Sequence, residues 1–289
     1  MKILNFFLFL TLFTLNISLS FANDNSENNS KNKFKVLQYN VEPVRWEKEL
    51  KELIYDKNEV ILDGRKIMEL TTPYRAQDAA IVPISLKFNK IQNDKEYVES
   101  IIFVVDENPS PIVGKFFMTT KTGNPDIATR VRIDKYTYVR AIAEMNNGKK
   151  YMVANFVKAA GGCSAPSLAD MDSVMARLGK MKMKLIKTGE VGNVNKAQFI
   201  ISHPNFSGLQ FSQLTRTEIP AHFVNQVKII QDGESILEVE SDISISEDPS
   251  FTFYYLNTGG PISVEVTDSD GQKFSKEWPV NKLILNSKL

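Results

Sequence analysis

The sequence predicts a mainly β protein with two antiparallel β-sandwiches joined by a short helical segment. Two stretches of the chain contain short runs rich in β-branched and aromatic residues, separated by turn-forming clusters such as 106–109 and 146–148. Between these stretches lies one segment, 167–182, with apolar residues at helical spacing. The length of 289 residues also fits two ordinary domains behind a leader better than one.

The first residues predict a signal peptide over 1–22. Lys2 precedes a mostly apolar stretch, and the small residues Ser20 and Ala22 occupy the positions that a signal peptidase reads. A membrane anchor is the alternative, but the stretch is short, contains Asn16 and has no basic flank after it. We therefore expect the mature protein outside the cytoplasm, in the periplasm of a cell with two membranes.

The charge balance is close to zero. The chain has 35 Lys and Arg and 34 Asp and Glu, and cleavage after Ala22 removes only Lys2 from this balance. No global field would then steer the mature protein to nucleic acid or to an anionic membrane. Residues 23–34 are polar without an apolar period, which predicts a disordered tether.

The first domain is expected to cover 35–166. It begins with a helix after Pro43, in which Trp46 and Leu50, followed by Leu53 and Ile54, recur at helical spacing. Six strands are then expected, at 79–86, 98–105, 113–118, 128–133, 138–143 and 151–157.

The second domain is expected to cover 183–289, after the helical linker 167–182. Ser167 is a candidate N-cap of that helix, Gly179 a candidate end, and its apolar face should dock on the protein. Strands are expected at 183–186, 197–202, 227–231, 236–240, 251–256 and 262–267. The pairs Asp232-Gly233 and Asp270-Gly271 are hairpin signals, and Trp46 and Trp278 are expected to anchor the two cores.

The chain contains one cysteine, Cys163, within the run Ala-Ala-Gly-Gly-Cys-Ser-Ala-Pro at 159–166. In an oxidising compartment a cysteine without a partner is either buried and inert or exposed and reactive. Because Gly161, Gly162 and Ser164 suggest a flexible segment, we expect an exposed and reactive thiol.

The two halves resemble two known proteins of sulfur metabolism. The first half resembles SoxY, a subunit of the thiosulfate-oxidation carrier, in Asp78-Ala79-Ala80-Ile81-Val82-Pro83, Asn108-Pro109-Ser110-Pro111, Thr129-Arg130-Val131-Arg132 and Gly161-Gly162-Cys163. The second half resembles its partner SoxZ in Ile201-Ser202-His203-Pro204, Gly208, Ile219-Pro220-Ala221-His222-Phe223, Ser246-Glu247-Asp248-Pro249 and the 268–271 turn. Together the two resemblances cover nearly the whole mature chain, which is similar to fused SoxYZ-like carriers associated with quinoprotein dehydrogenases.

This resemblance implies immunoglobulin-like sandwiches and a periplasmic carrier without catalysis of its own. Cys163 would hold a sulfur-compound intermediate as a covalent adduct and present it to sulfur-oxidising or quinoprotein dehydrogenase enzymes, while the two halves pack as an intramolecular SoxY–SoxZ pair. The alternative is an accessory docking module for a periplasmic quinoprotein (PQQ) dehydrogenase that does not use the thiol for sulfur transfer. The Cys163→Ser variant distinguishes the two hypotheses: it should abolish the function of a carrier and leave that of a docking module unchanged.

One departure from the family concerns the cysteine segment. In the two-subunit carrier it is a free C-terminal arm, whereas here the chain continues to Leu289, and Ser164-Ala165-Pro166 replaces a second pair of glycines. A segment held at both ends can only bulge, so we expect shallow docking into partners.

Other chemistry is less well supported. Arg130 and Arg132 alternate along a predicted strand and could contact an anionic adduct, although an exposed face paired with Asp134 and Glu144 is the favoured interpretation.

His203 and His222, the only histidines, could bind a metal together with Cys163 and with methionines, namely Met171, Met175, Met181 and Met183. The spacings match no compact ligand motif, so we expect no metal or cofactor, and histidines that hold strand ends or the interface between the halves. A cysteine hydrolase would need one of these histidines beside Cys163.

Overall fold

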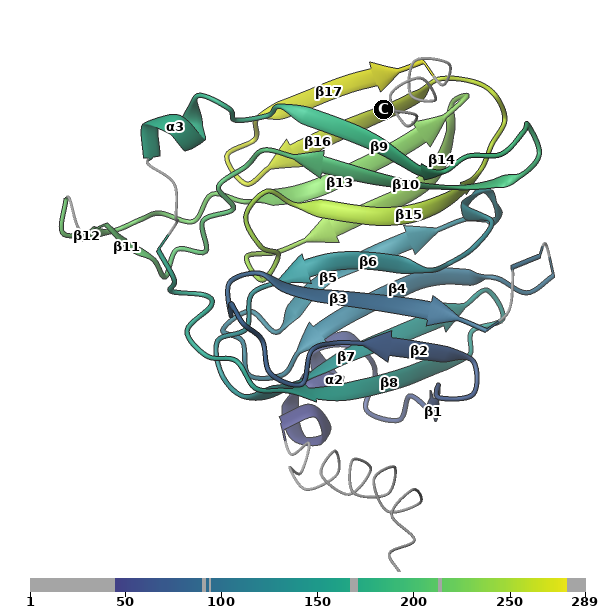
Figure 1. Ribbon diagram of the computed structural model, residues 1–289. Coiled ribbons are helices and arrows are strands. Elements are labelled where there is room, and N and C mark those ends of the chain that lie inside the picture. The colour runs from purple at the N-terminus through teal and green to yellow at the C-terminus, as the bar shows by residue number, and fades with distance from the viewer. Residues whose placement is uncertain (1–44, 90–91, 94, 167–170, 213–214, 280–289) are drawn as a thin grey trace, which may run out of the picture. The chain divides into compact units, whose positions relative to one another are not determined.

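Strands form almost all of the regular structure and assemble into two large sheets (Figure 1). The computed structural model describes residues 45–89, 92–93, 95–166, 171–212 and 215–279. The predicted signal peptide, 1–22, and tether, 23–34, lie outside the described residues. The mainly β class is confirmed.

All six strands predicted for the first half are present, as β3 to β8. Its elements are η1 (Trp46–Leu50), α2 (Lys51–Ile54), β1 (Ile61–Asp63), β2 (Met68–Thr71), β3 (Val82–Phe88), β4 (Val98–Val105), β5 (Ile112–Met118), η2 (Thr120–Thr122), β6 (Ile127–Val131), β7 (Thr137–Met145) and β8 (Lys150–Val157). The helix predicted after Pro43 is also found: its Trp46 and Leu50 are buried, whereas Leu53 is exposed, contrary to the pattern. Strands β1 and β2 were not predicted, because three or four residues are too few to show the alternation of apolar and polar side chains that marks a strand.

All six strands predicted for the second half are present as well. Its elements are α3 (Met171–Met175), β9 (Met181–Lys187), β10 (Val194–Ile201), β11 (Phe211–Ser212), β12 (Thr217–Glu218), β13 (Val224–Gln231), β14 (Glu234–Ser241), β15 (Ser250–Leu256), β16 (Ile262–Asp268) and β17 (Lys273–Trp278). Both hairpin signals are confirmed, since Asp232-Gly233 joins β13 to β14 and Asp270-Gly271 joins β16 to β17. At the first turn Asp232 and Gly233 have φ of 52° and 78°, the left-handed pair that a two-residue hairpin needs.

The predicted linker contains the short helix α3, while Ser167 lies outside the described residues. Val174 of α3 is buried, but Met175 is 42% exposed, so the apolar face docks only in part. The short hairpin β11–β12 leaves the sandwich on the same side as α3 (Figure 1). Among the described residues, no helix has the length and apolar character needed to cross a membrane.

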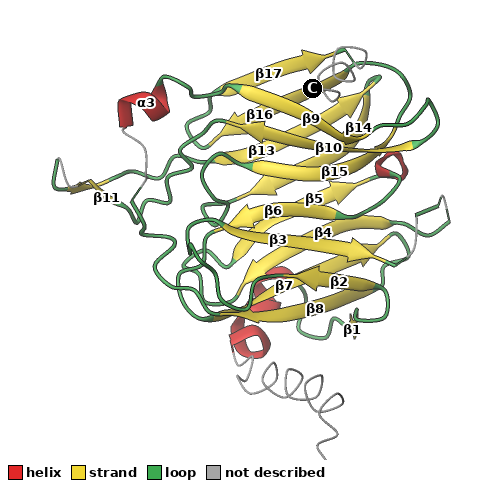
Figure 2. Ribbon diagram, in the orientation of Figure 1, coloured by secondary structure: helices red, strands yellow, loops and turns green. Residues whose placement is uncertain are grey.

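The two halves share both sheets. The 9-stranded sheet has the order β1-β8-β7-β4-β5-β14-β13-β16-β17, and the 6-stranded sheet has the order β2-β3-β6-β15-β10-β9 (Figure 2). In each sheet a strand of the first half pairs with a strand of the second, β5 with β14 and β6 with β15. The expectation that the halves pack on each other is therefore confirmed, and the packing is edge to edge, which removes one open edge from each half of each sheet.

Close packing supports this junction between β5 and β14. A Cβ atom at Gly114 of β5 would lie 2.6 Å from the Glu240 carbonyl oxygen of β14, so only glycine allows the two backbones to approach this closely. In the interior, the rings of Phe116 and Phe251 from opposite halves meet edge to face at a centroid distance of 5.8 Å. One cluster of buried apolar residues extends through both halves.

Candidate functional site

The cysteine segment leaves β8 and folds back against the strand end that follows β6. The Gly161 amide donates to the Asp134 carbonyl at 2.8 Å, and the Gly162 amide donates to the Ile133 carbonyl at 2.9 Å. Gly161 adopts a φ of +80°, which turns the chain at this point. Residues 161–164 therefore form a hydrogen-bonded turn, which contradicts the expectation of a free, flexible segment on this side of Cys163.

Gly162 is required for close packing. A Cβ atom there would lie 2.0 Å from the carbonyl oxygen of Ala79 and 2.7 Å from that of Ile133. The glycine therefore lets the turn press against the backbone before β3 and after β6, a use of glycine different from the flexibility that the sequence suggested.

The Cys163 side chain is 0% exposed, so the expectation of an exposed, reactive thiol is wrong for this conformation. Burial, together with the charge of Asp134, raises the pKa of the thiol to about 12. The thiolate is the nucleophilic form, so the buried thiol is held in its unreactive state at neutral pH. The error arose because the residues that bury Cys163 come from distant parts of the chain.

The second half holds the turn through Ser207 and Gln210. The Ser207 hydroxyl donates to the Cys163 carbonyl oxygen at 2.5 Å, and the Gln210 side-chain amide donates to the Ala165 carbonyl at 2.9 Å. The Ser207 amide donates in turn to the Gln210 side-chain oxygen at 3.1 Å, so the two residues brace each other. Both are almost completely buried, at 4% and 1% exposed.

Arg132 is the cation associated with Cys163. It is 2% exposed, forms no ion pair within the described residues, and has an Nε atom without a hydrogen-bond partner there. Burial lowers the pKa of Arg132, while the Cys163 sulfur and Glu247 act in the opposite direction. A buried guanidinium without a carboxylate partner is expensive, and it would be stabilised by an anion at the cysteine.

Arg130 and Arg132 have different surroundings, contrary to the expectation that they share one exposed face of a strand. Arg130 is half-buried on β6 and donates to the Asp248 carbonyl at 2.6 Å, whereas Arg132 follows the end of β6 and donates to the Ile245 carbonyl at 2.6 Å. Both arginines therefore cross to the second half. Pairing with Asp134 or Glu144 is not observed in the described residues, and Glu144 pairs instead with Lys115.

The sequence signatures of the two halves meet at this junction. Asn108 is fully buried, and its side-chain amide donates to the Arg132 carbonyl at 2.8 Å and to the Ser244 hydroxyl at 2.9 Å. Its side-chain oxygen accepts from the Asp134 amide at 2.9 Å. Ser246, from the SoxZ-like stretch 246–249, donates its hydroxyl hydrogen bond to the carbonyl of Ala80 in the SoxY-like stretch 78–83, at 2.7 Å. These polar residues tie the two halves together around the cysteine turn.

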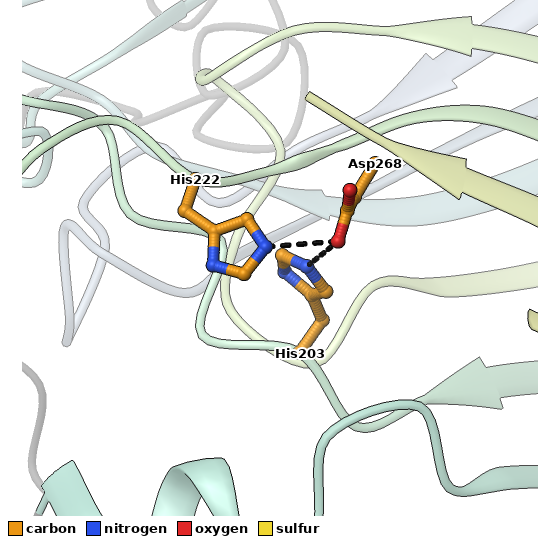
Figure 3. A group of neighbouring side chains, drawn as sticks. All are labelled: His203, His222 and Asp268. Carbon is orange, nitrogen blue, oxygen red and sulfur yellow. Dashed lines mark hydrogen bonds and ion pairs between the residues drawn. The ribbon is translucent and has the colours of Figure 1, made fainter. Parts of the chain in front are cut away.

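The histidines form a second buried cluster with Asp268 (Figure 3). One Asp268 oxygen lies 2.8 Å from His222 Nε2 and 3.4 Å from His203 Nε2, and the three ligand-type atoms lie within 4.8 Å of one another. The two imidazole rings stand edge to face with centroids 4.6 Å apart. Cys163 is not a member of this cluster.

Hydrogen bonding in this cluster disfavours a metal ion. His203 Nδ1 accepts a hydrogen bond from the Asn205 amide at 3.0 Å, so the ring proton resides on Nε2, the atom that faces Asp268. A metal ligand would need the opposite tautomer, with Nε2 free to coordinate. The other Asp268 oxygen accepts from the amides of Asp270 and Gln272, which completes a structural network.

Sequence reasoning missed Ser207, Gln210 and Asp268 as site residues. Gly208, which was part of the SoxZ resemblance, has a φ of +81° and makes the turn that brings Ser207 and Gln210 to the same side. That glycine was a usable signal for a tight turn, but the hydrogen bond from Ser207 to Cys163 joins residues 44 positions apart, beyond any local pattern.

Comparison with known families agrees with this architecture of two halves and one cysteine. The family described as Sulfur oxidation protein SoxY matches residues 51–163, and the family described as Sulphur oxidation protein SoxZ matches residues 183–279. The protein is thus a fused, two-part protein of sulfur oxidation. It belongs to the SoxY and SoxZ families, with both domains in one chain.

No curated protein matched the chain. A solved superoxide reductase (neelaredoxin) from Ignicoccus hospitalis is 17% identical with a TM-score of 0.29, and the match covers 38% of this chain and 98% of that one. A β-glycosidase from Bacteroides vulgatus is 7% identical with a TM-score of 0.23, over 73% of this chain and 24% of that one. Likenesses this distant support no conclusion about function.

Proposed function

We propose that this protein is a periplasmic carrier that holds a sulfur-compound intermediate covalently on Cys163 and presents it to partner enzymes. The observation that carries the proposal is that the SoxY match ends at the only cysteine of the chain. The junction between the SoxY-like and SoxZ-like halves surrounds this residue with hydrogen bonds from both. The protein supplies the attachment point, and the partners supply the chemistry.

The chemistry at Cys163 is the formation of a sulfur–sulfur bond. When thiosulfate is the cargo, its outer sulfur joins the cysteine sulfur to give Cys-S-S-SO₃⁻, and one proton and two electrons leave. A redox partner protein must accept these electrons. The adduct is an anion, and the Arg132 guanidinium, which has no ion pair within the described residues, is its candidate counter-charge.

Burial of the thiol favours a second candidate, a non-catalytic docking module that does not use Cys163. Its partner would be a periplasmic quinoprotein dehydrogenase, as the resemblance of the sequence implies. In that case the cysteine would be a small buried side chain that fills space in the interior.

Intact-mass spectrometry of protein isolated from its host without reductant tests the carrier function. We expect an added mass that dithiothreitol removes and that peptide mapping confines to Cys163. The Cys163→Ser variant is the control, since it should fold and bind partners but carry no adduct. A bare thiol in cells with active partner enzymes, with normal function of Cys163→Ser, would overturn the proposal in favour of the docking module.

A further inference from the structure

We propose that Ser207 and Gln210 form a latch that keeps the Cys163 thiol buried and must open before the thiol can react. This inference rests on the proposed function, because it states how the carrier site is regulated. The latch residues come from the SoxZ-like half and the thiol from the SoxY-like half, so the second half controls access to the residue that the first half supplies.

The need for an opening follows from burial. The thiol is 0% exposed, and the Gly162 position beside it has no room for even one additional carbon atom. An incoming reagent must approach the sulfur in line with the bond that it breaks, which this conformation does not allow. Reaction at Cys163 therefore requires the 161–166 turn to move away from the backbone against which it packs.

Ser207 and Gln210 are the two side chains of the second half that donate hydrogen bonds to the turn among the described residues. Ser207 holds the Cys163 carbonyl and Gln210 holds the Ala165 carbonyl, so both anchors act on the segment that must move. Each bond favours the closed conformation by about two- to tenfold. Such a contribution is large enough to suppress the open state and small enough for a partner or a thermal fluctuation to overcome.

The surroundings distinguish a functional latch from ordinary packing. Ser207 and Gln210 point inward and are buried, while the intervening Leu209 is 44% exposed and the following Phe211 is 53% exposed. The latch loop is thus accessible from outside while it closes the site inside. The buried Arg132, with its Nε unpartnered, shows that the closed site has a polar group suited to an anion.

The test measures the rate at which iodoacetamide alkylates Cys163 in the full-length protein from pH 7 to 9. The cysteine thiolate displaces iodide, and the thiol proton passes to the buffer, so no sulfur cargo is involved. We expect Ser207→Ala and Gln210→Met to accelerate labelling by about fivefold each at every pH, because each loses one anchoring bond. Ser207→Thr, which keeps the hydroxyl, should restore the slow rate.

Ser241→Ala is the matched control. The Ser241 hydroxyl donates the same kind of bond, to the Val224 carbonyl at 2.7 Å, and this bond joins β14 to β13 rather than to the 161–166 turn. We expect its labelling rate to equal that of the wild type. Unchanged rates in both latch variants, or equal acceleration in Ser241→Ala, would overturn the latch, the second by showing that general destabilisation exposes the thiol. Because the labelling assay needs no sulfur cargo, it can disprove the latch without disproving the carrier function. Likewise, mass spectrometry can disprove the carrier function without disproving the latch.

Discussion

At the level of single residues, burial decides the protonation state of Cys163 and of the histidine cluster. The same desolvation raises the pKa of Cys163 to about 12 and lowers the pKa of His203 to about 4, because it disfavours the thiolate in one case and the imidazolium in the other. Both groups are therefore neutral at physiological pH. Arg132 is different, because a guanidinium keeps its charge even when buried.

Arg132 should discriminate between anionic and neutral reagents at Cys163. We predict that Arg132→Gln slows the reaction with tetrathionate about tenfold more than the reaction with iodoacetamide, since only the anionic reagent uses the guanidinium. The ratio of the two rate constants cancels any change in the exposure or pKa of the thiol. Arg130→Gln is the control, and a ratio unchanged in Arg132→Gln would remove the anion-binding role.

His203 should make the protein sensitive to acid. Its pKa is about 4 in the folded protein because burial lowers it, the nearby His222 lowers it further, and Asp268 only partly opposes this. The unfolded chain has an ordinary value near 6.5, so it binds a proton first as the pH falls. We predict that the free energy of unfolding decreases by about 2–3 kcal/mol between pH 6.5 and pH 4.

Urea unfolding at several pH values measures this effect. In His203→Asn the stability should be lower at pH 7 but nearly constant down to pH 4, where the carboxyl of Asp268, with its lowered pKa, is still ionised. A variant that keeps the full acid dependence would show that His203 is not its source.

At the level of elements, the cysteine turn depends on close backbone packing. We predict that Gly162→Ala lowers the free energy of unfolding by about 3 kcal/mol, because the new methyl group overlaps the Ala79 carbonyl oxygen. Gly161→Ala should lower it by only about 1–2 kcal/mol, since its φ is unfavourable for alanine but the space around it is open.

Chemical denaturation of both variants gives these values, and alkylation of Cys163 provides a second measurement. Gly162→Ala should also accelerate alkylation, because a displaced turn exposes the sulfur. Equal stability in the two variants would show that the turn moves freely and does not pack as described.

The strands themselves follow from local pattern, whereas their partners do not. In β9 the apolar residues Met181, Met183 and Leu185 alternate with lysines, which already predicts a strand with one buried face. The structure buries these three residues. Nothing in β5 indicates that it pairs with β14, because strand pairing is set by hydrogen bonds and side-chain packing between distant segments.

At the level of the whole molecule, the continuous sheets should make the two halves unfold together. Trp46 lies in the first half and Trp278 in the second, and they are the only two tryptophans of the chain. In a Trp278→Phe background the fluorescence reports on the first half alone. We predict that adding Phe251→Ala, a change in the second half, shifts this fluorescence transition by about 3–5 kcal/mol, because Phe251 packs on Phe116 across the junction.

The same transition followed by circular dichroism is the control and should coincide with the fluorescence. If Phe251→Ala destabilised the protein by circular dichroism but left the Trp46 transition unchanged, the halves would be independent folding units. That result would contradict a junction that transmits stability.

The sequence by itself determined the mainly β class, twelve of the strands, the hairpin turns and the two families, because these depend on side-chain periods, turn chemistry and signatures over short stretches. It also identified Cys163 as the residue of interest. Only the tertiary structure decided that the thiol is buried, that the buried Arg132 interacts with it electrostatically and has no ion pair among the described residues, and that Ser207 and Gln210 hold its segment. The physical reason is that burial and electrostatics at Cys163 come from groups far away in the chain, and only folding brings those groups together.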